Sequence, residues 1–66
     1  MSNWIKFKDK FPLNGQLVYT YNSKEGLFNI GHYSEEYNAV IDFDDFKIEA
    51  THWMNPIKPE GEMNNE

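Results

Sequence analysis

The chain has 66 residues, enough for one domain with one small core, and it contains no cysteine that could form a disulfide or a thiolate metal site. Eleven acidic residues against six lysines, with no arginine, give a formal charge of −5. This balance argues against direct binding of DNA or RNA, which requires a basic surface. The start lacks the apolar stretch of a signal peptide, and no segment approaches the roughly 20 apolar residues that span a bilayer, so we expect a cytoplasmic protein with no membrane partner.

The N-terminal segment alternates between two kinds of side chain, which predicts a short strand. Ile5 and Phe7 fall on one side. The other side carries an indole and three amines, those of Trp4, Lys6, Lys8 and Lys10. Lysines discourage edge-to-edge pairing, so we expect an edge strand. Pro12 and Asn14-Gly15 then predict an irregular loop.

The middle of the chain predicts a hairpin. Residues 16–21 and 27–33 are rich in β-branched and aromatic side chains, and residues 23–26, Ser-Lys-Glu-Gly, separate them. Residues 37–43 alternate apolar and polar side chains, as residues 46–51 do after an Asp-Asp turn. The sequence therefore predicts an all-β fold: a small antiparallel meander of four to five strands, curled into an SH3-like partial barrel.

The end of the chain marks the boundary of the domain. Pro56, Pro59 and Gly61 stand among polar residues that offer nothing to a core. We expect residues 1–59 to form a single β domain and residues 60–66 to be a disordered acidic tail.

Four short motifs along the chain resemble a small phage and prophage family, domain of unknown function 551. Trp4-Ile5 matches its opening, Phe11-Pro12 its Leu-Pro, Gly15 to Tyr19 its glycine and Val-Leu-Val-like strand, and Thr51-His52-Trp53-Met54 its closing signature. The chain departs from the family at Asn55, which separates Met54 from the following proline, and at Ala50, where the family has valine. The resemblance implies a phage accessory protein acting in the infected host cell.

Candidate catalytic and metal-binding groups are few. His52 beside Thr51 could act as a general base, but a strand histidine next to a tryptophan is more often structural, and no nucleophile accompanies it. Asp42-Phe43-Asp44-Asp45 with Glu49 lacks the glycine and the final glutamate of an EF-hand loop, so these acids are interpreted as solvated turn residues. Two histidines without any cysteine are too few to form a typical zinc site. We therefore expect no enzyme, no metal and no cofactor.

Aromatic side chains are the strongest functional signal. Six of the eleven exceed what so small a core can fully enclose, so some should form a binding face that stacks a nucleobase or anchors a protein: Trp4, Tyr19, Tyr21, Tyr33, Tyr37 and Trp53. Alternatively, Trp4 and Trp53 pack on each other and close the sheet. The candidate residues for binding a ligand or partner are Trp53, His52, Trp4, Tyr33, Tyr21 and Lys6.

The resemblance to a phage family, together with the lack of a catalytic constellation, favours a non-enzymatic binder that counters bacterial defence, either by sequestering a small nucleotide-type immune signal or by blocking a host defence protein. The alternative is a structural or assembly accessory of the phage particle or replication machinery. A hydrolase that uses His52 is a third hypothesis. Because a small sheet leaves aromatic surface and one edge uncovered, we also expect a homo-oligomer.

Overall fold

The computed structural model describes residues 3–57, which form one six-stranded antiparallel sheet and no helix. The strands are β1 (Ile5–Lys6), β2 (Leu17–Asn22), β3 (Leu27–Ser34), β4 (Ala39–Ile41), β5 (Lys47–Ile48) and β6 (His52–Met54). The prediction of an all-β antiparallel fold is confirmed, with six strands in place of the expected four to five, because the C-terminal part of the chain forms two short strands, β5 and β6. The domain boundary after residue 59 and the tail at residues 60–66 lie outside the described residues and stay predictions.

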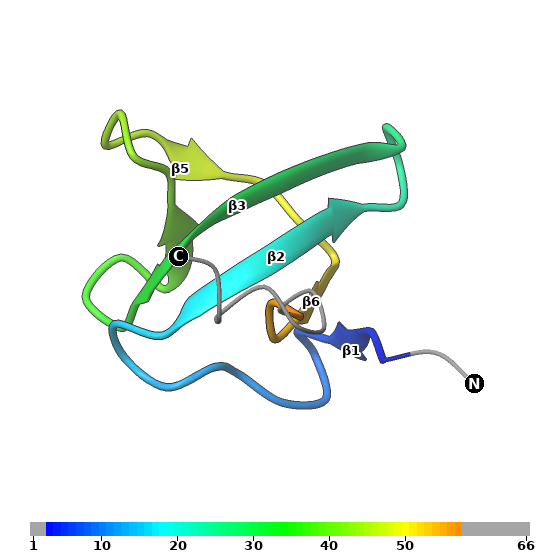
Figure 1. The fold of residues 1–66 in the computed structure, drawn as a ribbon, viewed down its shortest axis with the longest axis horizontal. Helices are drawn as coiled ribbons and strands as arrows, with labels where there is room; N and C mark the ends of the chain where they lie inside the picture. Colours follow the sequence, from blue (N-terminus) through cyan, green and yellow to red (C-terminus); the bar gives the residue numbers. More distant parts are fainter. Residues whose placement is uncertain (1–2, 58–66) are drawn as a thin grey trace, which may run out of the picture.

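The order of the strands across the sheet is β1-β6-β2-β3-β4-β5. Strands β2 to β5 follow one another as the predicted meander, and β6 returns across the molecule to lie between β1 and β2 (Figure 1). The N-terminal strand therefore lies at an edge of the sheet, as its lysines predict.

The β2–β3 hairpin has a well-defined turn. The Asn22 side-chain oxygen accepts hydrogen bonds from the amides of Lys24 (2.9 Å) and Glu25 (3.2 Å), while the Gly26 amide donates to the Asn22 carbonyl (2.7 Å). Gly26 has φ +70°, a conformation that glycine adopts without a steric penalty. The turn fixes the register, in which Asn22 faces Leu27 and Leu17 faces His32.

The core lies on the concave, inner face of the sheet. Its buried residues are Val18, Tyr33, Val40 and Trp53, and Ile5, Phe7 and Ile48 pack against them. Ile5 belongs to β1 and Ile48 to β5, the two strands at opposite edges of the sheet. Both edges pack on one cluster, so the sheet must curl, which agrees with the expected partial barrel.

β4 lies very close to β3 at Gly31. A Cβ atom at Gly31 would lie 2.9 Å from Val40 Cγ1 and closer still to the Ile41 carbonyl oxygen, so only glycine fits. On the N-terminal side of Gly31, the four residues Leu27–Ile30 are all exposed. This half of β3 therefore belongs to a hairpin arm that extends away from the core (Figure 1).

The last predicted strand, residues 46–51, is broken in the structure. Only Lys47–Ile48 pairs with β4, and the chain bends at Thr51 before β6 begins. Thr51 causes this change, because its amide donates to the Tyr21 carbonyl (2.9 Å) and its carbonyl accepts from the Phe7 amide (3.1 Å). The chain is thereby directed away from β4 and into the gap between β1 and β2.

Candidate functional site

The face of each side chain follows from the strand register, because directly opposed residues in an antiparallel pair point to the same side. Lys6 opposes His52, His52 opposes Tyr21, and Tyr21 opposes Phe28. These four residues form a line across β1, β6, β2 and β3 on the outer face, away from the core. We call them, together with Trp4, the outer aromatic row.

The rings of this row are in contact with one another. Tyr21 and Phe28 have ring centroids 4.7 Å apart, and the Trp4 ring lies 6.0 Å from Tyr21 and 6.1 Å from Phe28. The His52 ring lies 6.1 Å from Tyr21. These separations are typical of interacting aromatic pairs, so the row is an ordered surface of rings.

The row is open to solvent. Phe28 is 67% exposed, while Trp4, Tyr21 and His52 are half-buried. Trp4, Tyr21, Phe28 and His52 line a depression of about 220 Å³. Trp4 and Phe28 also line a second depression of about 480 Å³, which continues over Tyr19 and Ile30. The two depressions share rings, so together they make one shallow apolar surface.

His52 is held in one orientation by Thr51. The Thr51 hydroxyl accepts from the Ser23 amide (3.0 Å) and lies 3.2 Å from the Tyr21 carbonyl oxygen and 2.7 Å from His52 Nδ1. The hydroxyl has a single proton, which goes either to the Tyr21 carbonyl or to Nδ1, so the tautomer of His52 depends on which of the two accepts it. Nε2 lies on the side of the ring away from Thr51.

Two of the residues predicted for binding lie elsewhere. Trp53 and Tyr33 are each 3% exposed in the core, where Trp53 Nε1 donates to the Lys10 carbonyl (2.9 Å) and the Tyr33 hydroxyl donates to Asn38 Oδ1 (3.0 Å). Trp53 and Tyr33 therefore lie apart from the other four candidates and present almost no exposed surface to a ligand. The alternative that Trp4 packs on Trp53 is wrong, because Ile5 opposes Trp53 and Trp4, one residue earlier, points to the opposite face.

The remaining candidates, Trp4, Lys6, Tyr21 and His52, do come together in the row. Phe28 is the member that the sequence analysis missed. The hairpin itself contained the necessary signal, because closing residues 16–21 on 27–33 through a four-residue turn places Phe28 opposite Tyr21.

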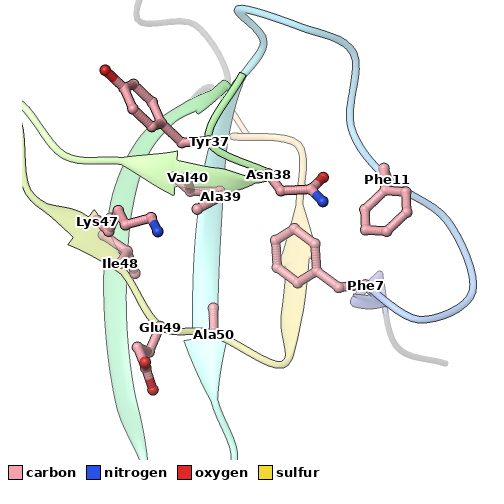
Figure 2. Close-up of a pocket in the computed structure, with 10 residues that line it drawn as sticks. All are labelled: Phe7, Phe11, Tyr37, Asn38, Ala39, Val40, Lys47, Ile48, Glu49 and Ala50. Atoms are coloured by element: carbon pink, nitrogen blue, oxygen red, sulfur yellow. The ribbon is translucent and has the colours of Figure 1, made fainter. Parts of the chain in front are cut away.

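A second concavity lies on the other side of the molecule, between the two edges of the curled sheet. Figure 2 shows Phe7 and Phe11 on one side of this cleft and residues 47–50 on the other. Its volume is about 340 Å³, and Lys47 and Glu49 bring opposite charges to its rim. None of the six predicted binding residues lines it. The outer aromatic row is therefore the better candidate site.

No protein-family model, curated protein or solved structure matches the chain. The resemblance to domain of unknown function 551 stays a prediction. Within residues 3–57, no group of three or more histidine, aspartate or glutamate side chains is arranged to hold a metal ion, and no helix is long and apolar enough to cross a membrane.

Proposed function

We propose that this protein is a non-enzymatic binder whose outer aromatic row takes up a small nucleotide-type ligand. The observation that carries the proposal is the placement of three mutually contacting rings, Trp4, Tyr21 and Phe28, on the same face of the sheet as His52 and Lys6. Nucleotides combine a flat ring with an anionic group, and this row offers an aromatic surface at one end and a cation at the other.

Stacking supplies the apolar part of the binding. Every base has a π-face, and one base stacked on an aromatic side chain contributes roughly 1–3 kcal/mol. Phe28, 67% exposed, is the ring most accessible to a base. A base placed there also covers part of Trp4, since the two rings line the same depressions.

The anionic part of the ligand is held by Lys6. Lys6 opposes His52 in the strand register, so the two side chains leave the sheet next to each other, at the same end of the row. In a chain with a charge of −5, a phosphate is repelled over most of the surface, which favours binding where a lysine is exposed. His52 Nε2 adds a hydrogen-bonding group for a sugar hydroxyl, as donor or acceptor according to the tautomer of the ring.

The resemblance to the phage family supports an immune signal of the infected host cell as the ligand. In this proposal the protein counters bacterial defence by sequestering that signal. A second candidate uses the same surface to block a host defence protein. The wide, shallow shape of the row and the exposure of Phe28 favour this alternative, because exposed aromatic side chains anchor protein interfaces.

The test begins with protein purified from infected cells, heated to release any bound small molecule and analysed by mass spectrometry. Isothermal titration with adenosine monophosphate and with cyclic dinucleotides then measures affinity. Phe28→Ala should weaken binding roughly 5- to 150-fold, the equivalent of one lost stack. Phe46→Ala is the matched control, since Phe46 is 69% exposed and lies outside the row.

A bound nucleotide whose affinity falls in Phe28→Ala but not in Phe46→Ala supports sequestration. Empty protein that captures one host protein, and loses it in Phe28→Ala alone, supports the blocker. Equal behaviour of the two variants in both assays contradicts the assignment of the outer aromatic row as the binding surface.

A further inference from the structure

Strand β3 is longer than the strand that covers it. β2 pairs with β3 from Leu27 to His32, whereas β4 pairs with β3 only from His32 to Ser34. Within residues 3–57, no strand pairs with the four residues Leu27–Ile30 on the β4 side. The hairpin arm therefore has one open edge.

The backbone groups at this edge are those of Phe28 and Ile30. The Tyr33 amide donates to the Gln16 carbonyl (2.9 Å), and the Tyr33 carbonyl accepts from the Gly15 amide (2.7 Å), so Tyr33 directs both groups toward the β2 side. Backbone groups alternate along a strand, and the register of the hairpin is continuous. Phe28 and Ile30 consequently point their N–H and C=O groups away from β2.

This edge lacks the devices that protect the other two. Edge strands in monomeric proteins are usually very short or carry lysine, proline or a bulge. β1 is two residues long and contains Lys6, and β5 is two residues long and contains Lys47. The open edge of β3 has the uncharged sequence Leu-Phe-Asn-Ile. Its apolar side chains are 53% (Leu27), 67% (Phe28) and 37% (Ile30) exposed.

We propose that a second copy of the chain pairs antiparallel along Leu27–Ile30, about a two-fold axis at Asn29, so that Phe28 of each copy lies opposite the partner's Ile30 and one continuous sheet runs through both copies. An antiparallel strand pairs with itself under exactly this symmetry, and each copy then presents the same surface. Two chains of −5 repel each other, so charge opposes association over most of the surface. The open edge is an uncharged segment, and it is therefore a place along which two copies can approach.

The pairing satisfies the backbone groups of Phe28 and Ile30 and buries side chains on both faces of the arm. On the outer face, Phe28 lies beside the partner's Ile30, so the two outer aromatic rows lie on one continuous face of the joined sheet. Leu27 is covered on the opposite face, where it has no contact with the row. The contact is only four residues long, and interfaces of such small area are weak, so the dimer should depend strongly on concentration.

Sedimentation equilibrium over a concentration series tests the proposal. The wild-type chain should show a species approaching twice the 7.8 kDa of the monomer as concentration rises. Leu27→Lys and Ile30→Lys each place a charge at the edge and should shift the chain to monomer. Leu13→Lys is the matched control, because Leu13 is 76% exposed in the loop before β2, and this variant should dimerise like the wild type.

Amide hydrogen exchange of the wild-type protein gives an independent measurement of the same contact. Phe28 and Ile30 amides should become protected as concentration rises, while the Leu27 and Asn29 amides, which face β2, should change little. A chain that stays monomeric at the highest concentration used for NMR overturns the proposal. So does a dimer that both lysine variants leave intact, or one without added protection at Phe28 and Ile30.

Discussion

Replacing Trp53 tests the assignment of the core. The side chain is 3% exposed, its ring centroid lies 6.5 Å from that of Phe7, and its Nε1 donates to the Lys10 carbonyl. Truncating a buried tryptophan to alanine typically costs about 3–5 kcal/mol. A domain of 66 residues has a total stability of roughly 3–10 kcal/mol, at about 0.05–0.15 kcal/mol per residue. Trp53→Ala should therefore lose from about a third to all of its free energy of unfolding, and if the total stability lies at the lower end of its range the variant unfolds.

A conservative variant separates packing from hydrogen bonding. Trp53→Phe keeps a ring in the core but leaves the Lys10 carbonyl without its donor, at a cost of about 1 kcal/mol. In a domain of this size, that change should lower the melting temperature by roughly 4–8 °C.

Urea and thermal unfolding followed by far-ultraviolet circular dichroism measure both variants. Trp4→Ala is the control, because Trp4 is half-buried on the outer face and its removal should cost less than that of Trp53. A Trp53→Ala protein that unfolds at the same urea concentration as the wild type, or a Trp4→Ala protein that is the less stable of the two, would refute the placement of Trp53 in the core.

Three further substitutions have expected outcomes. Gly31→Ala forces a Cβ atom against the Ile41 backbone and should cost about 1–3 kcal/mol in urea unfolding, so wild-type stability would contradict the close approach of β4 to β3. Gly26→Ala meets no atom within 4 Å but has φ +70°, so a purely conformational loss of about 1–2 kcal/mol is expected in the same assay. Thr51→Val removes the hydroxyl next to His52 and should destabilise the protein by about 1–3 kcal/mol. NMR of the imidazole nitrogens should show a changed balance between the two tautomers of His52, and unchanged spectra would contradict the contact between Thr51 and His52.

Local periodicity was sufficient to predict the hairpin but failed at the end of the sheet. Phe46, Ile48 and Ala50 alternate like a strand, yet Phe46 is 69% exposed. The Asp42 carboxylate accepts hydrogen bonds from the amides of Asp44 and Phe46 (2.9 Å each), which forms a tight turn, and Thr51 then directs the chain toward β2. Such bonds between side chain and backbone leave no periodic signal, so alternation alone predicts one continuous strand.

The candidate site was predictable in its residue types but not in its faces. Which side Trp4 and Trp53 occupy depends on the pairing of β1 with β6, two strands far apart in the sequence. A shift of one residue in this register would exchange the faces of all side chains in β1. Alternation determines which residues share a face within one strand, and only the paired structure determines how the faces of β1 and β6 combine.

The position of β6 has a consequence for the synthesis of the protein. Residues synthesised first cannot complete the sheet, because β1 has no neighbour until His52–Met54 has emerged and taken its place beside β2. Up to that moment Ile5 and Phe7 lack Trp53, the ring on which they pack. A ribosome that stalls within the last part of this chain therefore holds an unfinished sheet with exposed apolar side chains, the kind of species that aggregates and that chaperones and proteases recognise.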